Sequence, residues 1–149
     1  MAEPSPGYEA RNREQTRRLT SLRRLDETAL RRPVGEHWTV AVALAHIQYW
    51  DARALGALEA WRRHGIPLTL WRSDEAVVND LRLDLWRALP PREALEQAIV
   101  TANALDGVIE VLTPAETTAV AALRPSVLER ASHRDDHLSE IDEVLRRMA

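Results

Sequence analysis

A regular apolar pattern between residues 95 and 112 most constrains what this chain can fold into. Apolar side chains recur there in alternating steps of three and four residues, namely Leu95, Ala98, Ala102, Leu105, Ile109 and Leu112. This spacing puts all of them on one stripe of an α-helix. A stripe with this alternation is typical of a helix that is buried between neighbours in a bundle. The pattern therefore predicts a helical protein in which other helices cover this one.

Other segments share the helical period and have recognisable boundaries. We predict four principal helices and one shorter inserted helix, at about residues 8–25, 39–64, 91–112 and 127–148, and at 74–89. Thr39 caps the second helix, and Gly65 with Pro67 ends it. Pro90 and Pro91 break the chain after the inserted helix. The expected fold is all-α, a four-helix bundle with one short inserted helix.

Three local features refine the helix boundaries. Asn12 and Gln15 interrupt the apolar stripe of the first helix, so we expect that helix to be partly exposed. A capping box from Thr113 to Glu116 predicts a brief helix before Pro125. A second capping box predicts that the last helix opens at Ser126, whose hydroxyl would accept a hydrogen bond from the Glu129 amide.

Length and composition limit the classes that remain. The 149 residues suit one domain, 1–149, with residues 1–7 as a flexible tail. The net charge of −3, without a basic stripe, argues against nucleic acid as a partner. The N-terminus has no apolar signal region, and no segment has the roughly 20 apolar residues that span a bilayer. We therefore expect a soluble, cytoplasmic protein that has no membrane partner.

Three histidines point toward the predicted interior. His133 and His137 are four residues apart and lie on the same side of the last helix, at the margin of its apolar arc. His46 lies near the middle of the apolar face of the second helix. Each could simply fill a half-buried position and form local hydrogen bonds. Three together favour a divalent metal such as zinc, nickel or iron(II), with a fourth position open as in catalytic sites.

Two of these segments resemble a known family. The stretch from Trp38 to Asp51, WTVAVALAHIQYWD, and the stretch from His133 to Ile141, HRDDHLSEI, are similar to motifs of the DinB-like (DinB/YfiT) family. The resemblance implies a four-helix bundle in which His46, His133 and His137 hold a divalent metal, often in a homodimer. It also implies a bacterial setting, because characterised relatives include metal-dependent transferases and isomerases that use the thiols mycothiol or bacillithiol. It does not imply DNA binding.

The absence of cysteine shapes the predicted chemistry. Disulfides, zinc–thiolate sites and a cysteine nucleophile are excluded, so a sulfur nucleophile would have to come from a cosubstrate. We predict a thiol-dependent S-transferase or related detoxifying enzyme that acts on small electrophiles. The alternatives are a hydrolase that uses metal-activated water and a non-catalytic stress protein that binds a metal or small ligand. Arg134 stands where the zincin motif would have its glutamate, so that motif does not support the hydrolase.

Several further side chains are candidates for the surroundings of the metal. Those expected to line the pocket are Trp50, Asn79, Arg130 and Arg134. The two arginines could bind an anionic substrate or extend over the end of the bundle to solvent. Asp51 and Glu140 are possible hydrogen-bond acceptors for the ligating rings, or ordinary solvated carboxylates.

Two further histidines are expected outside the metal site, and some apolar surface is expected to form a dimer interface. His37 is expected in a surface loop, and His64 at the C-terminal end of a helix, so neither is expected to bind metal. The stripe from Leu95 to Leu112, together with several tryptophans, could leave apolar surface after the helices close. We therefore expect a homodimer.

Overall fold

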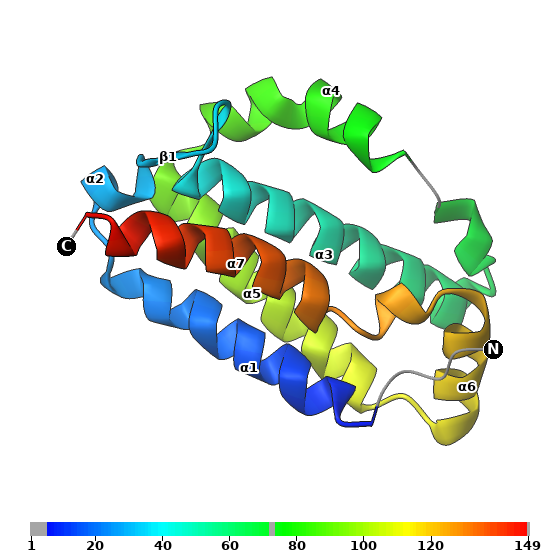
Figure 1. Ribbon diagram of the computed structural model, residues 1–149. Coiled ribbons are helices and arrows are strands. Elements are labelled where there is room, and N and C mark those ends of the chain that lie inside the picture. The colour runs from blue at the N-terminus through cyan, green and yellow to red at the C-terminus, as the bar shows by residue number, and fades with distance from the viewer. Residues whose placement is uncertain (1–5, 72–73, 149) are drawn as a thin grey trace.

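The computed structural model describes residues 6–71 and 74–148 and is mostly helical (Figure 1). The helices are α1 Tyr8–Ser21, α2 Glu27–Leu30, α3 Val40–His64, α4 Glu75–Ala88, α5 Pro91–Glu110, α6 Pro114–Leu123 and α7 Ala131–Arg146. Short 3-10 turns lie at η1 Leu22–Arg24, η2 Leu68–Trp71 and η3 Pro125–Val127. Two antiparallel strands, β1 Pro33–Val34 and β2 Trp38–Thr39, form a small hairpin. The predicted helical class is confirmed, and residues 1–5 of the expected flexible tail lie outside the described residues.

The four long helices α1, α3, α5 and α7 lie side by side (Figure 1). Both α1 and α3 contact α5 and α7, so the four helices enclose a common interior. The helix α4 lies outside this group and packs mainly against α3, while α6 contacts η2 and η3 near one end of the molecule. In the part of the chain that the structure describes, no single helix is long and apolar enough to cross a membrane. Taken together, α5 and α6 have the length and composition for this, but a bend of 116° separates them.

Most of the predicted helix ends are confirmed. The Thr39 hydroxyl accepts a hydrogen bond from the Val42 amide at 3.2 Å, and α3 ends at Gly65 in a left-handed conformation with φ of 65°. Thr113 and Glu116 form the predicted capping box at the start of α6. Asp74 caps α4; Ser73, which was expected to help start this helix, lies outside the described residues.

The predicted start of the last helix is wrong. Residues Pro125–Val127 form a 3-10 turn, and α7 begins only at Ala131, without the capping box expected at Ser126. The Glu129 carboxylate instead accepts a hydrogen bond from the Ser132 amide at 3.2 Å. A local motif was present in the sequence, but a contact from another helix determines where α7 begins.

That contact comes from Asn12 on α1. Its side-chain oxygen accepts hydrogen bonds from the backbone amides of Arg130 and Ala131, both at 2.9 Å. Its side-chain nitrogen donates to the Leu128 carbonyl at 2.7 Å. Asn12 therefore satisfies amides that would otherwise be unpaired at the beginning of α7.

The helix α1 is partly exposed, as expected, with Glu9, Glu14 and Arg17 on its outer side, but three of its polar residues are buried. Asn12, Gln15 and Thr16 are 1%, 9% and 4% exposed. They interrupt the apolar stripe because they face a polar network inside the protein. Buried polar groups of this kind must find hydrogen-bond partners in the interior.

Arg134 is the centre of that network. Its side chain is fully buried, its Nε donates to Asp51 on α3 at 2.8 Å, and its Nη1 donates to Asp106 on α5 at 2.9 Å. The same Nη1 donates to Thr16 on α1 at 3.0 Å. Arg130 also binds Asp51, with its Nε at 2.9 Å from a carboxylate oxygen. Two buried carboxylates are thus balanced by two arginines, and Arg134 joins all four long helices.

The apolar stripe of α5 is part of the core, as predicted. Its buried members are at most 1% exposed, namely Leu95, Ala98, Ala102, Leu105 and Ile109. Leu112, the last member of the stripe, is partly buried. Large exposed apolar side chains include Val100 of α5 at 65%, and Val77, Leu81 and Leu85 of α4 at 54%, 76% and 63%. The homodimer stays a prediction, which a measurement of molar mass in solution would test.

Replacing Arg134 tests the network. We expect Arg134→Met to lower the free energy of unfolding by about 3–5 kcal/mol, because Asp51 and Asp106 would keep buried charges without their main partner. Urea unfolding followed by circular dichroism measures this loss. The matched control is Arg23→Met, which removes an exposed ion pair with Glu96 and should cost less than about 1 kcal/mol. Equal effects of the two changes would contradict a central role for the network.

Candidate metal centre

The structure brings the three predicted histidines together. His46 extends from α3, and His133 and His137 extend from α7. The Nε2 atoms of His46 and His133 are 3.0 Å apart, and one ring nitrogen of each histidine lies within 4.8 Å of those of the other two. His46 is fully buried, whereas the His137 side chain is 16% exposed. These three residues could hold a metal ion.

The ion-pair network determines how these histidines meet. Arg134 lies between His133 and His137 in the sequence and binds Asp51, which follows His46 by five residues on α3. The pairing of Arg134 with Asp51 therefore fixes the register of α7 against α3. With that register, both imidazoles of α7 lie against the imidazole of α3.

The distance between the ring nitrogens of His46 and His133 suits a shared metal, whereas the ring of His137 would have to move slightly to join them. With metal–nitrogen distances of roughly 2.1 Å, tetrahedral ligand atoms lie about 3.4 Å apart. The 3.0 Å between His46 and His133 is close to this value, and a separation of 4.8 Å must shorten by about 1.4 Å to reach it. Side-chain rotation is enough for a movement of that size.

Local hydrogen bonding explains the three imidazoles only in part, because the Nε2 atoms of His46 and His133 can share one hydrogen bond at 3.0 Å. The Nδ1 atoms of His46, His133 and His137 are all buried, and none has a hydrogen-bond partner among the residues that the structure describes. Buried polar atoms without partners are costly and uncommon. Local contacts therefore leave the Nδ1 side of each ring unsatisfied.

Burial keeps two of the rings neutral. The pKa of His46 is lowered from 6.5 to about 3, first by burial and then by the neighbouring His137 and His133. The pKa of His133 is also lowered to about 3, by burial and by the positive charge of Arg130. Metal binding requires neutral imidazole, so these two rings are in the right state at neutral pH.

Aromatic rings enclose the histidines. The Trp38 ring centroid is 4.8 Å from that of His46 and 5.7 Å from that of His137, and Trp86 lies edge-on to His46 at 5.4 Å. Trp50, which was expected to line the pocket, is 6.3 Å from His46. Helical periodicity could not have placed Trp38, because the hairpin that contains Val34 orients it.

The inserted helix α4 supplies two polar side chains to the same place. Asn79, another predicted pocket residue, accepts a hydrogen bond from the Trp50 indole at 3.3 Å. One turn earlier, a Glu75 carboxylate oxygen is 3.8 Å from His46 Nε2. Glu75 was not predicted, although its spacing of four residues from Asn79 puts both on one face of α4.

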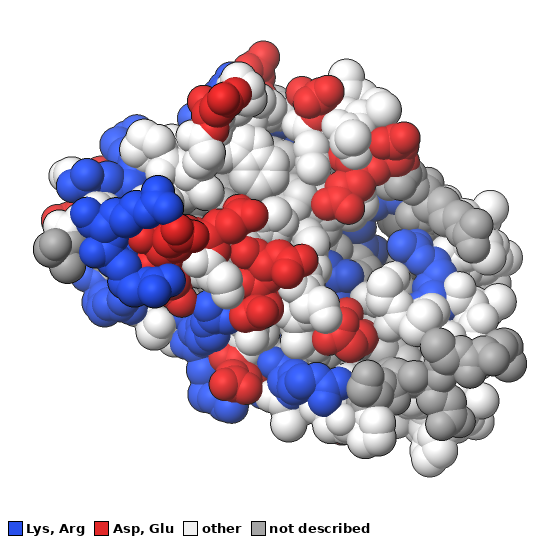
Figure 2. Space-filling model, viewed as in Figure 1, with Lys and Arg blue, Asp and Glu red and all other residues white. Residues whose placement is uncertain are grey.

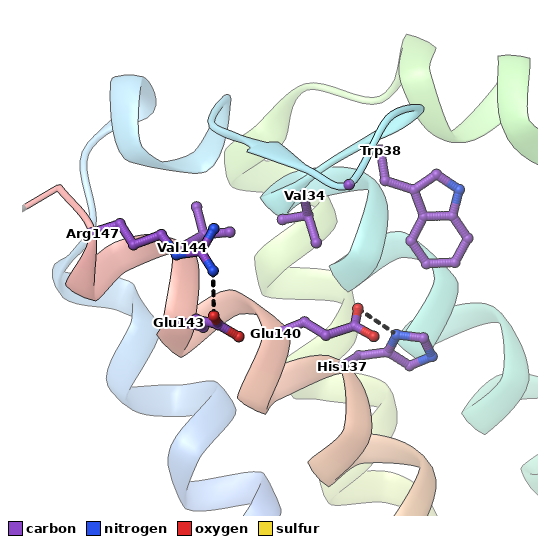
Figure 3. A pocket seen from close by; sticks show the side chains of 8 residues that line it. Val34, Trp38, His137, Glu140, Glu143, Val144 and Arg147 are labelled. Carbon is purple, nitrogen blue, oxygen red and sulfur yellow. Dashed lines mark hydrogen bonds and ion pairs between the residues drawn. The ribbon is translucent and has the colours of Figure 1, made fainter.

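The two carboxylates proposed as acceptors for the rings differ. A Glu140 oxygen is 3.7 Å from His137 Nδ1, which is close but too long for a hydrogen bond (Figure 3). Asp51 is fully buried and binds Arg130 and Arg134 instead of an imidazole. It acts on the site through the position of α7, which corrects the role expected for it.

The remaining candidates are also placed. Arg134 is fully buried and bound to Asp51 and Asp106, so it does not extend to solvent, contrary to one of the two expectations for it. Arg130 is almost as buried and borders a small cavity next to Trp50. His37 and His64 are exposed and lie outside the histidine cluster, as expected.

An open groove leads to the edge of the histidine cluster (Figure 3). Its volume is about 480 Å³, within the usual range for small-ligand sites. The lining residues are Val34, Gly35, Trp38, His137, Glu140, Glu143, Val144 and Arg147. His137 and Trp38 lie at one end of the groove, and the ion pair of Glu143 with Arg147 lies toward the other. A small molecule in this groove would therefore contact a histidine of the cluster.

Comparisons with protein families, with curated proteins and with solved structures find no match to this chain. The resemblance to the DinB-like family therefore stays a prediction. What the protein does must be argued from the chemistry of its own residues.

The lowered pKa values predict acid sensitivity of the metal-free protein. The unfolded chain titrates its histidines near pH 6.5, whereas His46 and His133 have a pKa of about 3 when folded. Between these values the unfolded chain binds more protons. The contribution of these two histidines to the free energy of unfolding should therefore be fully present above pH 6.5. It should decrease as the pH drops below 6.5, by up to about 1.4 kcal/mol per pH unit for each histidine.

Urea unfolding between pH 7.5 and 4.5 measures this dependence. His133→Gln should flatten the profile, because it removes one of the two titrating rings, whereas the exposed His37→Ala should leave the profile unchanged. If the urea concentration at the unfolding midpoint stayed constant down to pH 5, burial would not be holding the rings neutral.

Proposed function

We propose that the protein is a divalent-metal-dependent enzyme that joins a low-molecular-weight thiol to small electrophiles. In this proposal the four long helices form a DinB-like four-helix bundle, and His46, His133 and His137 are the metal ligands. The observation that carries the proposal is the convergence of three imidazoles from two helices, with one ring nitrogen of each within 4.8 Å of the others.

The donor set supports the choice of metal. Three imidazole nitrogens suit zinc, nickel or iron(II) better than magnesium or calcium, which prefer oxygen ligands. Three protein ligands leave a further position, as in catalytic zinc sites. The open groove beside His137 gives a cosubstrate access to that position. Glu140 is positioned to turn toward His137 Nδ1 and orient the ring, because the two groups are already 3.7 Å apart.

The composition and the groove support a thiol as the proposed cosubstrate. The chain has no cysteine, so in a thiol-dependent reaction the nucleophilic sulfur would come with a cosubstrate. A bound divalent ion would lower the pKa of that thiol and hold it as thiolate. Trp38 provides an apolar wall beside the site, and Glu143 and Arg147 provide charged groups that can bind the polar parts of a bacterial thiol such as mycothiol or bacillithiol.

One observation favours a second candidate function, hydrolysis by metal-activated water. That reaction uses a carboxylate as general base near the metal. Glu75 has a carboxylate oxygen 3.8 Å from His46 Nε2 and is exposed to solvent, so it can accept a proton and release it. A non-catalytic metal-binding role is the third possibility, and the absence of turnover with thiol or water would identify it.

The metal ligands are tested by single replacements. His46→Ala, His133→Ala and His137→Ala should each lower zinc affinity by more than the roughly 10–100-fold that follows loss of a group that only orients a ligand. Calorimetry and native mass spectrometry with zinc, nickel and iron(II) measure affinity and stoichiometry. His37→Ala and His64→Ala are matched controls, because both histidines are exposed, and they should bind metal as the wild type does. If all five variants bind alike, the cluster is structural.

Turnover separates the two enzymatic functions. We expect the metal-loaded wild type to conjugate a model electrophile with mycothiol or bacillithiol, and Glu75→Gln to retain at least about half of that rate. Glu75→Gln should strongly reduce any ester hydrolysis, because general-base catalysis contributes roughly 10²–10⁴-fold. Hydrolysis without thiol transfer would overturn the thiol assignment and favour the second candidate.

A further inference from the structure

The carboxylate of Glu75 reaches the histidine cluster from outside the four long helices. Glu75 is the first residue of α4, and one of its oxygens is 3.8 Å from His46 Nε2. In the part of the chain that the structure describes, this carboxylate forms no hydrogen bond and no other ion pair. The start of α4 does not need it as a cap, because the Asp74 side chain accepts a hydrogen bond from the Val77 amide at 3.2 Å. The position of Glu75 therefore calls for another explanation.

Glu75 approaches the side of His46 on which a metal would be bound. His46 Nε2 is also the atom that lies 3.0 Å from His133 Nε2. A metal shared by these two rings would therefore be bound through their Nε2 atoms. The Glu75 oxygen lies beside one of these two atoms, so it is on the side of the rings where a further ligand would be.

The distance between Glu75 and His46 suits two ligands of one ion. Tetrahedral ligand atoms at zinc lie about 3.4 Å apart, so the Glu75 oxygen would move about 0.4 Å closer to His46 Nε2. The Glu75 side chain is 59% exposed, so it can rotate without displacing packed neighbours. Carboxylate oxygens are ordinary zinc ligands, and glutamate occurs together with histidine in catalytic zinc sites. Glu75 is therefore able to join the three histidines in a four-coordinate site.

The charges around the cluster favour a cation between Glu75 and the rings. Burial lowers the pKa of His46 to about 3, so at neutral pH the contact joins a carboxylate to an uncharged imidazole. Such a contact stabilises the carboxylate little, whereas a divalent ion would bind it directly. Figure 2 shows acidic side chains over the start of α4 and along α7, with uncharged side chains between them. This face of the molecule therefore attracts cations.

We propose that Glu75 is a fourth metal ligand, which holds the open coordination position until the thiol cosubstrate arrives. This inference rests on the proposed function, because it takes both the three histidine ligands and the thiol from it. When the thiol binds, its proton goes to water, and Glu75 returns to solvent with its negative charge. Glu75 has no role in the transfer of sulfur to the electrophile, so thiol transfer should survive its replacement.

Hydrogen exchange of the full-length protein with and without zinc provides the first test. Ligation by Glu75 would tie the start of α4 to the core, whereas α4 otherwise packs mainly against α3. Zinc should therefore slow the exchange of the backbone amides of residues 78–82 at least about tenfold, together with those of α7. In Glu75→Gln, zinc should still slow the amides of α7 but not those of α4. This variant is expected to fold, because the side chain is exposed and forms no hydrogen bond with the described residues.

The exchange pattern separates failure of this inference from failure of the proposed function. If zinc slowed the amides of α7 alone in the wild type, Glu75 would not be a ligand, and the centre with three histidines would stand. If zinc slowed neither helix, the protein would not bind zinc, and both proposals would fall. Equal slowing of α4 in the wild type and in Glu75→Gln would also overturn ligation by Glu75.

Zinc affinity, measured by calorimetry, distinguishes a ligand from a nearby negative charge. Glu75→Gln should lower the affinity at least about tenfold. Glu75→Asp keeps the charge but shortens the side chain by one methylene, so it should lose most of this affinity as well. The matched control is Asp84→Asn, which makes the same charge change on α4 at a side chain that is 97% exposed, and it should bind zinc as the wild type does. Wild-type affinity in Glu75→Asp, or equal losses in Glu75→Gln and Asp84→Asn, would overturn ligation.

Thiol binding to the zinc-loaded protein tests the exchange of ligands. The probe is N-acetylcysteine, and the matched probe N-acetylserine, which has a hydroxyl in place of the thiol, should not bind. Because Glu75 and the thiol compete for one position, Glu75→Gln should bind the thiol more tightly by the same factor, about tenfold, by which it loses zinc affinity. Unchanged or weaker thiol binding in this variant would overturn the exchange. If zinc slowed the amides of α4 but neither protein bound the thiol, Glu75 would be a ligand and the thiol-dependent function would be refuted.

Discussion

The guanidinium of Arg134, buried between two carboxylates, is the interaction on which the rest of this structure depends. Asp51 and Asp106 lie on different helices, and a slide or rotation of α7 would leave charges in the interior without compensation. Apolar packing alone tolerates small changes of register, whereas a paired charge at 0% exposure does not. The ion pairs thereby select one arrangement of the helices, and in that arrangement the imidazoles of α7 lie against His46.

Features that depend on the local spacing of residues along a helix could be predicted from the sequence. Few of the contacts between residues far apart in the sequence could be. The helices, the caps at Thr39 and Thr113 and the inward direction of His46 all follow from residue spacing. Arginine and aspartate are usually exposed, so nothing local indicated that Arg134 and Asp51 meet in the core. The start of α7 was misplaced for a similar reason, because its cap comes from another helix.

The site combines groups of three different origins. The core helices α3 and α7 supply the imidazoles, the hairpin supplies Trp38, and the outer helix α4 brings Glu75 and Asn79. The rigid part of the site thus rests on the most buried helices. The other groups lie on elements that pack against these helices from outside.

The Asn12 cap has a consequence for the order in which this protein folds. The residues that it joins are 116 to 119 positions apart, so the entropy of closing a very long loop must be overcome before α7 gains its first satisfied amides. We therefore expect the last helix to form late, after α1 has docked. During synthesis, α1 leaves the ribosome long before the histidines of α7 do. Thus α1, which contributes none of the three histidines, affects when these histidines can come together.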